Sequence, residues 1–336
     1  MCNFAVKFLP NRTSMVEKTF ITDDKTSEVF VSLRIVKEVK GLFPSIRRKL
    51  KEYGYQLKDL AYTNDIWARD YMPVEIFKDE YLSFKYYPTY YDKEEEEELH
   101  KYADTNWKKV RMVDRIKLGE KLNYKETNLF VDGGNVVKAI DKNGTPCLIM
   151  TDKVLSDNDC EEDDVRQIIS ECTDGIVDVV FIPWEGNDYE GGIIDNPIGH
   201  SDGVLRYIAP GKLLLTNTHE LDTEDSSFSD YIKECLQDRF DVFELSFDDV
   251  NCPEKKDLSW CYINYLQVGK VILLPRLNCE YDEAAIKQIT TYFTGIHKDY
   301  VVDMIDYDMS DIVRGEDENG NVINGGGALN CLSWTI

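Results

Sequence analysis

The spacing of hydrophobic and polar residues predicts few helices and many short strands. Ile46, Leu50 and Tyr53 recur at helical intervals among basic residues, which predicts an amphipathic helix over residues 46–55. The same spacing predicts three further helices, over residues 161–172, 226–240 and 282–293. Most other apolar residues form short runs that are typical of strands. These runs are residues 128–131, 136–140, 147–151, 177–183, 204–208, 212–216, 242–247, 262–266, 270–275 and 300–305.

Two or three predicted strands accompany each predicted helix. A doubly wound parallel sheet would alternate strands and helices more evenly, so this density predicts a mixed α/β fold of small sheets, each backed by a helix. Asn143-Gly144 lies between two of the runs and predicts a tight hairpin. No long Gly/Ser-rich or Pro-rich linker divides the chain, so we predict a single domain over residues 1–336.

The chain is strongly acidic, with 63 Asp and Glu residues against 39 Lys and Arg residues and a formal net charge of −24. This charge disfavours nucleic acids and anionic membranes as partners. Hydrophobic residues make up 43% of the chain, enough for a core, so the acidity does not indicate disorder. The apolar runs are far shorter than the roughly 20 residues of a membrane-spanning helix. Residues 1–10 do not resemble a signal peptide, and we therefore expect a cytoplasmic protein.

The nine cysteines are scattered and include no CxxC pair. Neither a zinc knuckle nor a thioredoxin-type redox pair is therefore indicated. Reduced thiols are expected in a cytoplasmic protein, most of them as small buried residues.

Four polar or glycine-rich segments interrupt the predicted strands. One places two carboxylates, an arginine and a tryptophan before a proline, and another follows Asp132 with two glycines. A third carries His200 and Asp202 at alternate positions, which puts both side chains on one face of an extended segment. In the fourth, three glycines precede Cys331. Each segment alone also fits an ordinary turn, a surface ion pair, a structural histidine or a buried thiol. The segments are residues 63–73, 130–137, 196–203 and 324–334.

Taken together and in this order, the four segments resemble the guanidine-modifying superfamily, and most of all its agmatine deiminase and bacterial peptidyl-arginine deiminase branch. The residues that carry the resemblance are WARDYMP (67–73), DGGN (132–135), GHSDG (199–203) and GGGALNC (325–331). Residues 260–265, which lead into the predicted strand 270–275, also fit the family pattern. The likeness covers about residue 60 to the end of the chain, and the first sixty residues lack the tryptophan-rich opening of agmatine deiminases.

The resemblance implies a pentein fold, in which five ββαβ units surround a pseudo-fivefold axis with the site at the centre. It implies no metal and no organic cofactor, a small cationic guanidine as the binding partner, and a possible homodimer. Cys331 matches the nucleophile, His200 the general acid and base, and Asp132 the carboxylate that partners the histidine. The predicted substrate-binding residues are Asp70 and Asp202, which match the two carboxylates that grip the guanidinium, with Trp67, Arg69 and Asn330 beside them.

The chemistry of a guanidinium group fits these roles. The group is cationic and delocalised, so it is a poor electrophile, and two carboxylates can bind its nitrogens through paired, charge-assisted hydrogen bonds. Such binding places the central carbon in front of a cysteine thiolate. A histidine and a bound cation both favour the thiolate, against the two aspartates. We therefore expect hydrolysis to a ureido product and ammonia through a covalent thiouronium intermediate.

The substrate and two rival classes stay open. Asn330 stands where agmatine deiminases usually carry a histidine, so agmatine, arginine, a methylated arginine and a peptidyl arginine are all candidates. An amine could also intercept the covalent intermediate, which would make the protein an amidinotransferase. A papain-like hydrolase is disfavoured because Cys331 follows His200 and lies near the end of the chain. A non-catalytic guanidine-binding protein would keep Asp70 and Asp202 but tolerate loss of Cys331.

Overall fold

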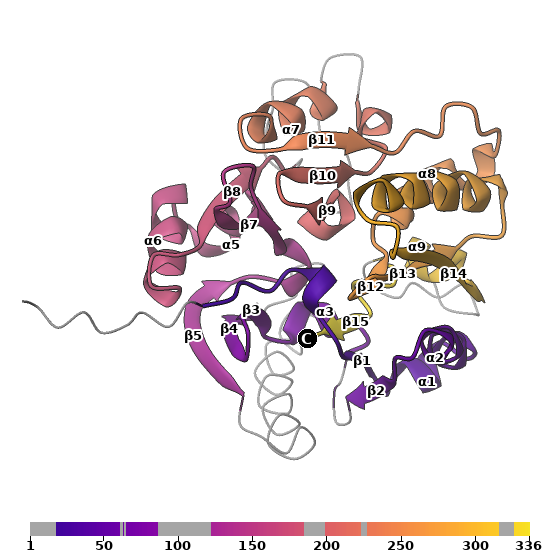
Figure 1. Cartoon of the computed structure of the whole chain (residues 1–336), viewed down its shortest axis with the longest axis horizontal. Coiled ribbons are helices and arrows are strands. Elements are labelled where there is room, and N and C mark those ends of the chain that lie inside the picture. Colours follow the sequence, from indigo (N-terminus) through magenta and orange to yellow (C-terminus); the bar gives the residue numbers. More distant parts are fainter. Residues whose placement is uncertain are drawn as a thin grey trace, which may run out of the picture.

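The computed structural model describes residues 18–60, 63, 65–86, 122–184, 199–222, 227–315 and 326–336 (Figure 1). Parts of three predicted polar segments, residues 64, 196–198 and 324–325, and residue 226 of a predicted helix lie outside these ranges.

The described strands form five three-stranded sheets with the same internal order. In each sheet the middle strand pairs antiparallel with one neighbour and parallel with the other. Four sheets take their strands in chain order, and the fifth joins the last strand of the chain to the first two. The sheets are β3 (Val74–Phe77), β4 (Glu80–Lys85) and β5 (Asn123–Phe130); β6 (Val137–Ile140), β7 (Pro146–Thr151) and β8 (Asp178–Ile182); β9 (Leu205–Ala209), β10 (Lys212–Leu215) and β11 (Asp241–Glu244); β12 (Leu266–Val268), β13 (Val271–Arg276) and β14 (Val301–Asp308); and β15 (Ser333–Thr335), β1 (Val29–Ser32) and β2 (Leu57–Leu60).

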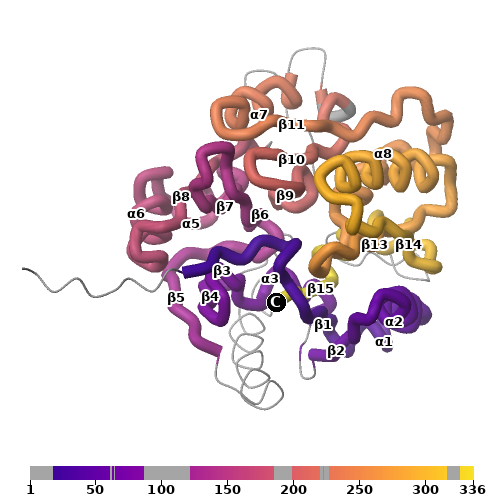
Figure 2. Tube along the Cα trace, viewed as in Figure 1, coloured from indigo at the N-terminus to yellow at the C-terminus, as the bar shows by residue number. Residues whose placement is uncertain are grey.

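Within the described residues, helices connect four of the five parallel strand pairs, because a parallel pair needs a long crossover. Figure 1 shows these helices towards the outside and strands β3, β12 and β15 nearer the middle. Figure 2 shows the chain passing around this middle in sequence order, from β3 through β10 to β14. The connecting helices are α1 (Ile35–Glu38) and α2 (Leu42–Glu52) between β1 and β2, α5 (Lys153–Asn158) and α6 (Glu162–Cys172) between β7 and β8, α7 (Phe228–Leu236) between β10 and β11, and α8 (Glu280–Ile296) between β13 and β14. A further helix, α9 (Ser310–Arg314), follows β14.

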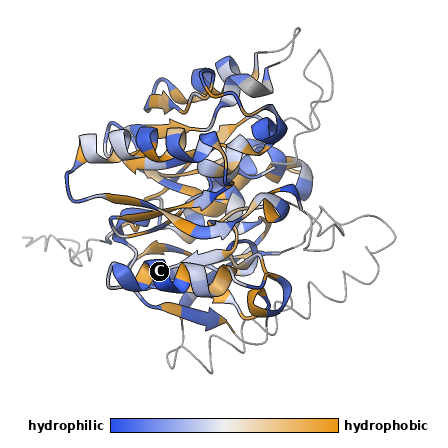
Figure 3. Cartoon of the chain, turned by 90° about the vertical axis from the view of Figure 1, so that its right-hand side faces the viewer, coloured by the Kyte–Doolittle hydropathy of each residue, from blue (hydrophilic) through white to orange (hydrophobic). Residues whose placement is uncertain are grey.

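The sheets pack on each other and on the helices through buried apolar side chains. Figure 3 shows many strand segments in orange, the colour of hydrophobic residues. One buried cluster joins Val137 of β6, Leu205 of β9 and Ile232 of α7. Another joins Ile46 of α2 to Leu273 of β13, and also contains Cys331. Neighbouring sheets thus share cores. No helix in the described ranges is long and apolar enough to cross a membrane.

The predicted mixed α/β fold of small sheets is confirmed, and helices α2, α6, α7 and α8 overlap the four predicted ones. The predicted hairpin at Asn143-Gly144 is confirmed between β6 and β7, with Gly144 at φ 84°. The strand predicted over residues 262–266 is wrong for most of its length. A 3₁₀ segment, η5 (Pro253–Tyr262), ends there, and turn hydrogen bonds from Ile263 and Asn264 continue it before β12 begins. Strands β1, β2, β3, β4 and β15 were not predicted.

Candidate functional site

The predicted site residues lie in or beside short turns that precede the first strand of four of the five sheets. Helix α3 (Ala68–Tyr71) precedes β3, and the 3₁₀ turns η2 (Gly133–Asn135) and η3 (Ser201–Gly203) precede β6 and β9. A turn that contains Cys331 precedes β15. Because each turn occupies the same place in its sheet, side chains more than sixty residues apart in sequence come together.

Buried polar side chains fix these turns. Asp65 accepts hydrogen bonds from the backbone N–H of Trp67 (3.0 Å) and from the Tyr86 hydroxyl (3.0 Å), so one of the two carboxylates in the first segment has a structural role. The Asn135 amide oxygen accepts from the backbone N–H of Ser201 at 3.2 Å and thereby joins the η2 turn to the η3 turn.

His200 lies between two carboxylates. Its Nε2 is 2.9 Å from Asp132 Oδ2, and its Nδ1 is 3.8 Å from Asp70 Oδ1. Burial alone would lower the pKa of this histidine, but the charge of Asp70 and the hydrogen bond to Asp132 raise the pKa of His200 to about 9. The imidazole therefore carries a proton at neutral pH.

Asp70 is buried beside the histidine and accepts a hydrogen bond of 2.9 Å from the Gly134 backbone N–H. Burial raises its pKa to about 8, and Asp132 and Asp202 add to this rise against the opposing effect of His200. Gly134 occupies the centre of the group. A Cβ atom there would lie 2.8 Å from both Asp70 Oδ1 and His200 Nδ1, and 3.3 Å from Asp202 Oδ1. The absence of a side chain at Gly134 thus keeps the space between these three groups open.

Cys331 is 8% exposed and faces Asp202. Its Sγ is 3.7 Å from Asp202 Oδ2 and 3.3 Å from the amide oxygen of Asn264. Burial, followed by the charges of Asp202 and Asp70, raises the pKa of the Cys331 thiol well above its ordinary value. Without a bound cation, the sulfur is therefore a neutral thiol.

Arg69 and Asn330 bond to each other. The Arg69 guanidinium donates to the Asn330 backbone carbonyl (3.3 Å), to the Asn330 amide oxygen (3.1 Å) and to the Thr335 hydroxyl (3.3 Å). The Asn330 amide nitrogen then donates to Asp202 Oδ2 at 2.6 Å. This chain of hydrogen bonds, from Arg69 through Asn330, holds the Asp202 carboxylate in its orientation.

Trp67 lies against the glycine-rich segment that precedes Cys331. It is 5% exposed, and a Cβ atom at Gly327 would lie only 2.4 Å from its ring. The glycine therefore allows the backbone of this segment to approach the indole face closely.

Two further polar residues adjoin the site that the sequence reasoning did not single out. Lys153 Nζ is 3.9 Å from Asp132 Oδ2 and also pairs with Asp157. Asn264 contacts Cys331, as given above, and precedes β12. Residues 70, 132, 202, 264 and 331 follow one another at intervals of 62 to 70 residues, so the interval itself was a signal for Asn264.

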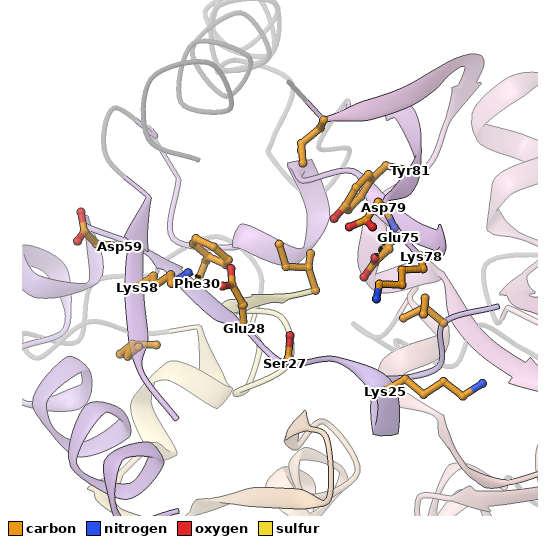
Figure 4. Close-up of a pocket in the computed structure, with 14 residues that line it drawn as sticks. Lys25, Ser27, Glu28, Phe30, Lys58, Asp59, Glu75, Lys78, Asp79 and Tyr81 are labelled. Atoms are coloured by element: carbon orange, nitrogen blue, oxygen red, sulfur yellow. Dashed lines mark hydrogen bonds and ion pairs between the residues drawn. The ribbon is translucent and has the colours of Figure 1, made fainter. Parts of the chain in front are cut away.

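A pocket of about 820 Å³ lies apart from these residues, along β1, β2 and the β3–β4 hairpin (Figure 4). Lysines and carboxylates line it together, and Lys58 pairs with Glu28 at 2.6 Å. None of the candidate site residues lines this pocket. In the described part of the chain, no group of three or more His, Cys, Asp or Glu side chains is arranged to hold a metal ion.

Comparisons with known proteins agree on one family. The sequence profile of the Porphyromonas-type peptidyl-arginine deiminases matches residues 12–334. The structure resembles the agmatine deiminase of C. jejuni at a TM-score of 0.63 and 15% identity, covering 95% of each chain. It resembles the agmatine deiminase of Enterococcus faecalis at a TM-score of 0.61 and 13% identity, again covering 95% of each chain. At these identities the likeness concerns the fold. No curated protein sequence matches the chain.

Proposed function

Because the chain belongs to the Porphyromonas-type peptidyl-arginine deiminase family, a family of guanidine-modifying hydrolases, we propose that it deiminates a guanidine substrate with Cys331 as the nucleophile. One observation carries the proposal. Asp70, His200 and Asp202 surround the side-chain-free position of Gly134, while Asp132 lies 2.9 Å from His200 and the Cys331 sulfur lies 3.7 Å from Asp202, so one cysteine, one histidine and three carboxylates from four segments of the chain form a single group. A cation with several N–H donors is the ligand that such a group of carboxylates suits.

Asp70 and Asp202 bind the guanidinium nitrogens from two sides in this proposal. Both are buried, so their hydrogen bonds to a cation are little weakened by water. Asn330 holds Asp202 and is itself held by Arg69, which gives these two residues supporting roles rather than direct contact with the substrate. Trp67 forms an apolar wall beside the glycine-rich segment.

The bound cation also makes the nucleophile available. Asp70 and Asp202 disfavour a thiolate in the empty site. A guanidinium held between them supplies a positive charge beside the sulfur, so the Cys331 proton is lost within the bound complex, in the step that leads to attack.

The reaction then proceeds in two halves. The Cys331 thiolate forms a C–S bond to the guanidinium carbon, and His200 donates its proton to the leaving nitrogen as the C–N bond breaks and ammonia departs. Water next attacks the thiouronium carbon while His200, now neutral, accepts the water proton. The C–S bond then breaks, the remaining hydroxyl proton of the adduct passes to the sulfur, and the ureido product leaves the restored Cys331 thiol. Asp132 keeps His200 oriented throughout.

Agmatine or a related arginine derivative is the substrate class that we propose. A cysteine-to-serine variant of the C. jejuni agmatine deiminase has been solved with substrate bound, which supports an equivalent role for Cys331. The family profile favours peptidyl arginine as the second candidate. Identification of the product separates deimination from amidinotransfer, because only deimination releases a ureido compound together with ammonia.

The arrangement of the sheets supports the pentein five-bladed propeller that the sequence resemblance implies. Five sheets share one strand order, and each contributes one turn to a common region. We propose that the chain forms a single catalytic domain of this kind over residues 1–336. The homodimer and the cytoplasmic location stay predictions, to be tested by light scattering and by cell fractionation.

An ammonia-release screen tests the proposed function. Agmatine, arginine, methylarginines and an arginine peptide are each incubated with the wild type and with Cys331→Ala. We expect release from at least one compound by the wild type, and a loss of at least a thousandfold in the variant. Retained turnover in Cys331→Ala would overturn the cysteine mechanism, and wild-type binding without turnover on any guanidine would favour a binding protein.

A further inference from the structure

Asn264 lies in the turn before β12, the first strand of its sheet. This is the one such turn that carries none of the site residues predicted from the sequence. Four of the turns before first strands carry Asp70, Asp132, His200 with Asp202, and Cys331. The remaining turn precedes β12 and ends at Asn264 and Tyr265. Asn264 is 0% exposed, although its side chain has two polar atoms. A fully buried amide must have hydrogen-bond partners, because an unpaired one would be strongly destabilising.

The partners of Asn264 are the nucleophile loop and the carboxylate turn. Its amide oxygen accepts from the backbone N–H groups of Asn330 (3.1 Å) and Cys331 (3.2 Å), and it lies 3.3 Å from Cys331 Sγ. Its amide nitrogen donates to the backbone carbonyl of Asp202 at 3.3 Å. One side chain therefore bridges two segments that are more than a hundred residues apart in sequence.

These contacts fix the orientation of the amide. The two backbone N–H groups on one side can only donate, so the amide oxygen of Asn264 must face them. The backbone carbonyl on the other side can only accept, so the amide nitrogen must face it. Cys331 Sγ then lies between Asn264 Oδ1 and Asp202 Oδ2, which limits the sulfur to one region of the site.

We infer that Asn264 is a positioning residue that holds the Cys331 sulfur in line with a guanidinium carbon bound by Asp70 and Asp202. The inference rests on the proposed nucleophile but not on any particular substrate. Asn264 does not contact Asp70, and Asp202 keeps its separate hydrogen bond from Asn330. Loss of the amide should therefore misplace the sulfur more than it weakens binding of the cation.

Covalent labelling tests the inference without turnover. In the reaction with 2-chloroacetamidine, a cationic guanidine mimic, the Cys331 sulfur forms a C–S bond and chloride leaves. Its inactivation kinetics give a binding constant, KI, and a maximal rate, kinact. Iodoacetamide is neutral and is not directed by the carboxylates, so its rate reports the reactivity of the same thiol. Peptide mass spectrometry assigns both labels to Cys331.

We expect Asn264→Ala to lower kinact for 2-chloroacetamidine at least tenfold relative to the iodoacetamide rate, with KI within threefold of the wild type. Asn264→Ser, whose side chain is too short to bridge both segments, should likewise lower the kinact ratio and leave KI nearly unchanged. It replaces the alanine variant in the test if that variant does not fold. Gln267→Ala is the matched control, because Gln267 is a buried amide on β12 that donates to the Gly269 carbonyl. Gln267→Ala should leave both labelling rates within threefold of those of the wild type.

An unchanged ratio of kinact to the iodoacetamide rate in folded Asn264→Ala or Asn264→Ser would overturn the inference. A tenfold weaker KI with unchanged kinact would also overturn it, because Asn264 would then serve binding. An equal effect in Gln267→Ala would show that the change comes from general disruption of β12, which would also overturn a specific role of Asn264. By contrast, a wild type in which 2-chloroacetamidine does not label Cys331 would refute the proposed nucleophile itself.

Discussion

At the scale of single residues, the site combines carboxylates that disfavour one another's charge with a histidine whose positive charge they favour. Burial and the nearby carboxylates raise the pKa of Asp70 to about 8, and the same carboxylates raise the pKa of His200 to about 9. At neutral pH Asp70 is therefore largely protonated in the empty site, and the hydrogen bond to Asp132 is what still favours the protonated form of His200. A cationic ligand replaces the proton on Asp70, so its binding releases a proton.

This exchange predicts a pH dependence of binding. Only ionised Asp70 binds a cation strongly, and its pKa lies near 8, so affinity should rise as the pH increases towards 8 and level off above it. The expected change in KI for 2-chloroacetamidine is about tenfold per pH unit below pH 8, as for exchange of a single proton. Inactivation kinetics between pH 5.5 and 9.5 measure it.

Asp70→Asn provides the comparison for this pH dependence. The amide cannot ionise, so KI should be weak at every pH and lose its slope. A wild-type KI that is flat between pH 6 and 8 would show that Asp70 is ionised throughout this range.

At the scale of elements, the short turns before the first strands decide the chemistry. Three such turns and the Cys331 segment could be found from the sequence because Asp, His, Gly and Cys there form unusual combinations. Asn264 was not singled out, because a single asparagine in the run WCYINY looks like one polar position of a strand, although its interval from the other site residues was a signal for it. Strands β2 and β4 escaped detection because both are short and irregular in pattern: Lys58 and Asp59 separate the two leucines of β2, and the apolar centre of β4 is broken by Ser83. The pairing of β2 with β1 and of β4 with β5 depends on contacts that local periodicity does not contain.

Gly134→Ala tests whether the η2 turn leaves room for the ligand. The added methyl group would lie 2.8 Å from Asp70 Oδ1 and His200 Nδ1, which fills the space proposed for the guanidinium. We expect KI for 2-chloroacetamidine to weaken at least tenfold while the protein stays folded.

Two other glycines serve as controls for this substitution. Gly144→Ala meets nothing within 4 Å but has φ +84°, so it should lower the free energy of unfolding by roughly 1 kcal/mol and leave KI unchanged. Gly133→Ala would place its Cβ 2.0 Å from the Arg69 backbone oxygen, so we expect poor folding. If Gly134→Ala binds as tightly as the wild type, the guanidinium does not occupy this space.

At the scale of the whole molecule, the two ends of the described chain meet in one sheet. Strand β15 pairs antiparallel with β1, so that Val29 faces Thr335 across the pair. This pairing spans about 300 residues of sequence, which explains why periodicity in neither segment pointed to it. Because Cys331 lies two residues before β15, the closure of this sheet also fixes the nucleophile.

Trp334 holds this closure together, and its loss should destabilise the whole fold. The indole is 2% exposed, donates from Nε1 to the Pro73 carbonyl at 2.8 Å, and packs on Phe30 with ring centroids 5.1 Å apart. Trp334→Ala should therefore lower the free energy of unfolding by about 3–5 kcal/mol, as expected for a large buried aromatic side chain. Urea denaturation measures the change, with Ile176→Ala, at 38% exposure, as a surface control expected to change it by less than about 0.5 kcal/mol. If both variants lose equally little, β15 does not tie the ends of the chain together, and the placement of Cys331 must then depend on Asn264 and Arg69 instead.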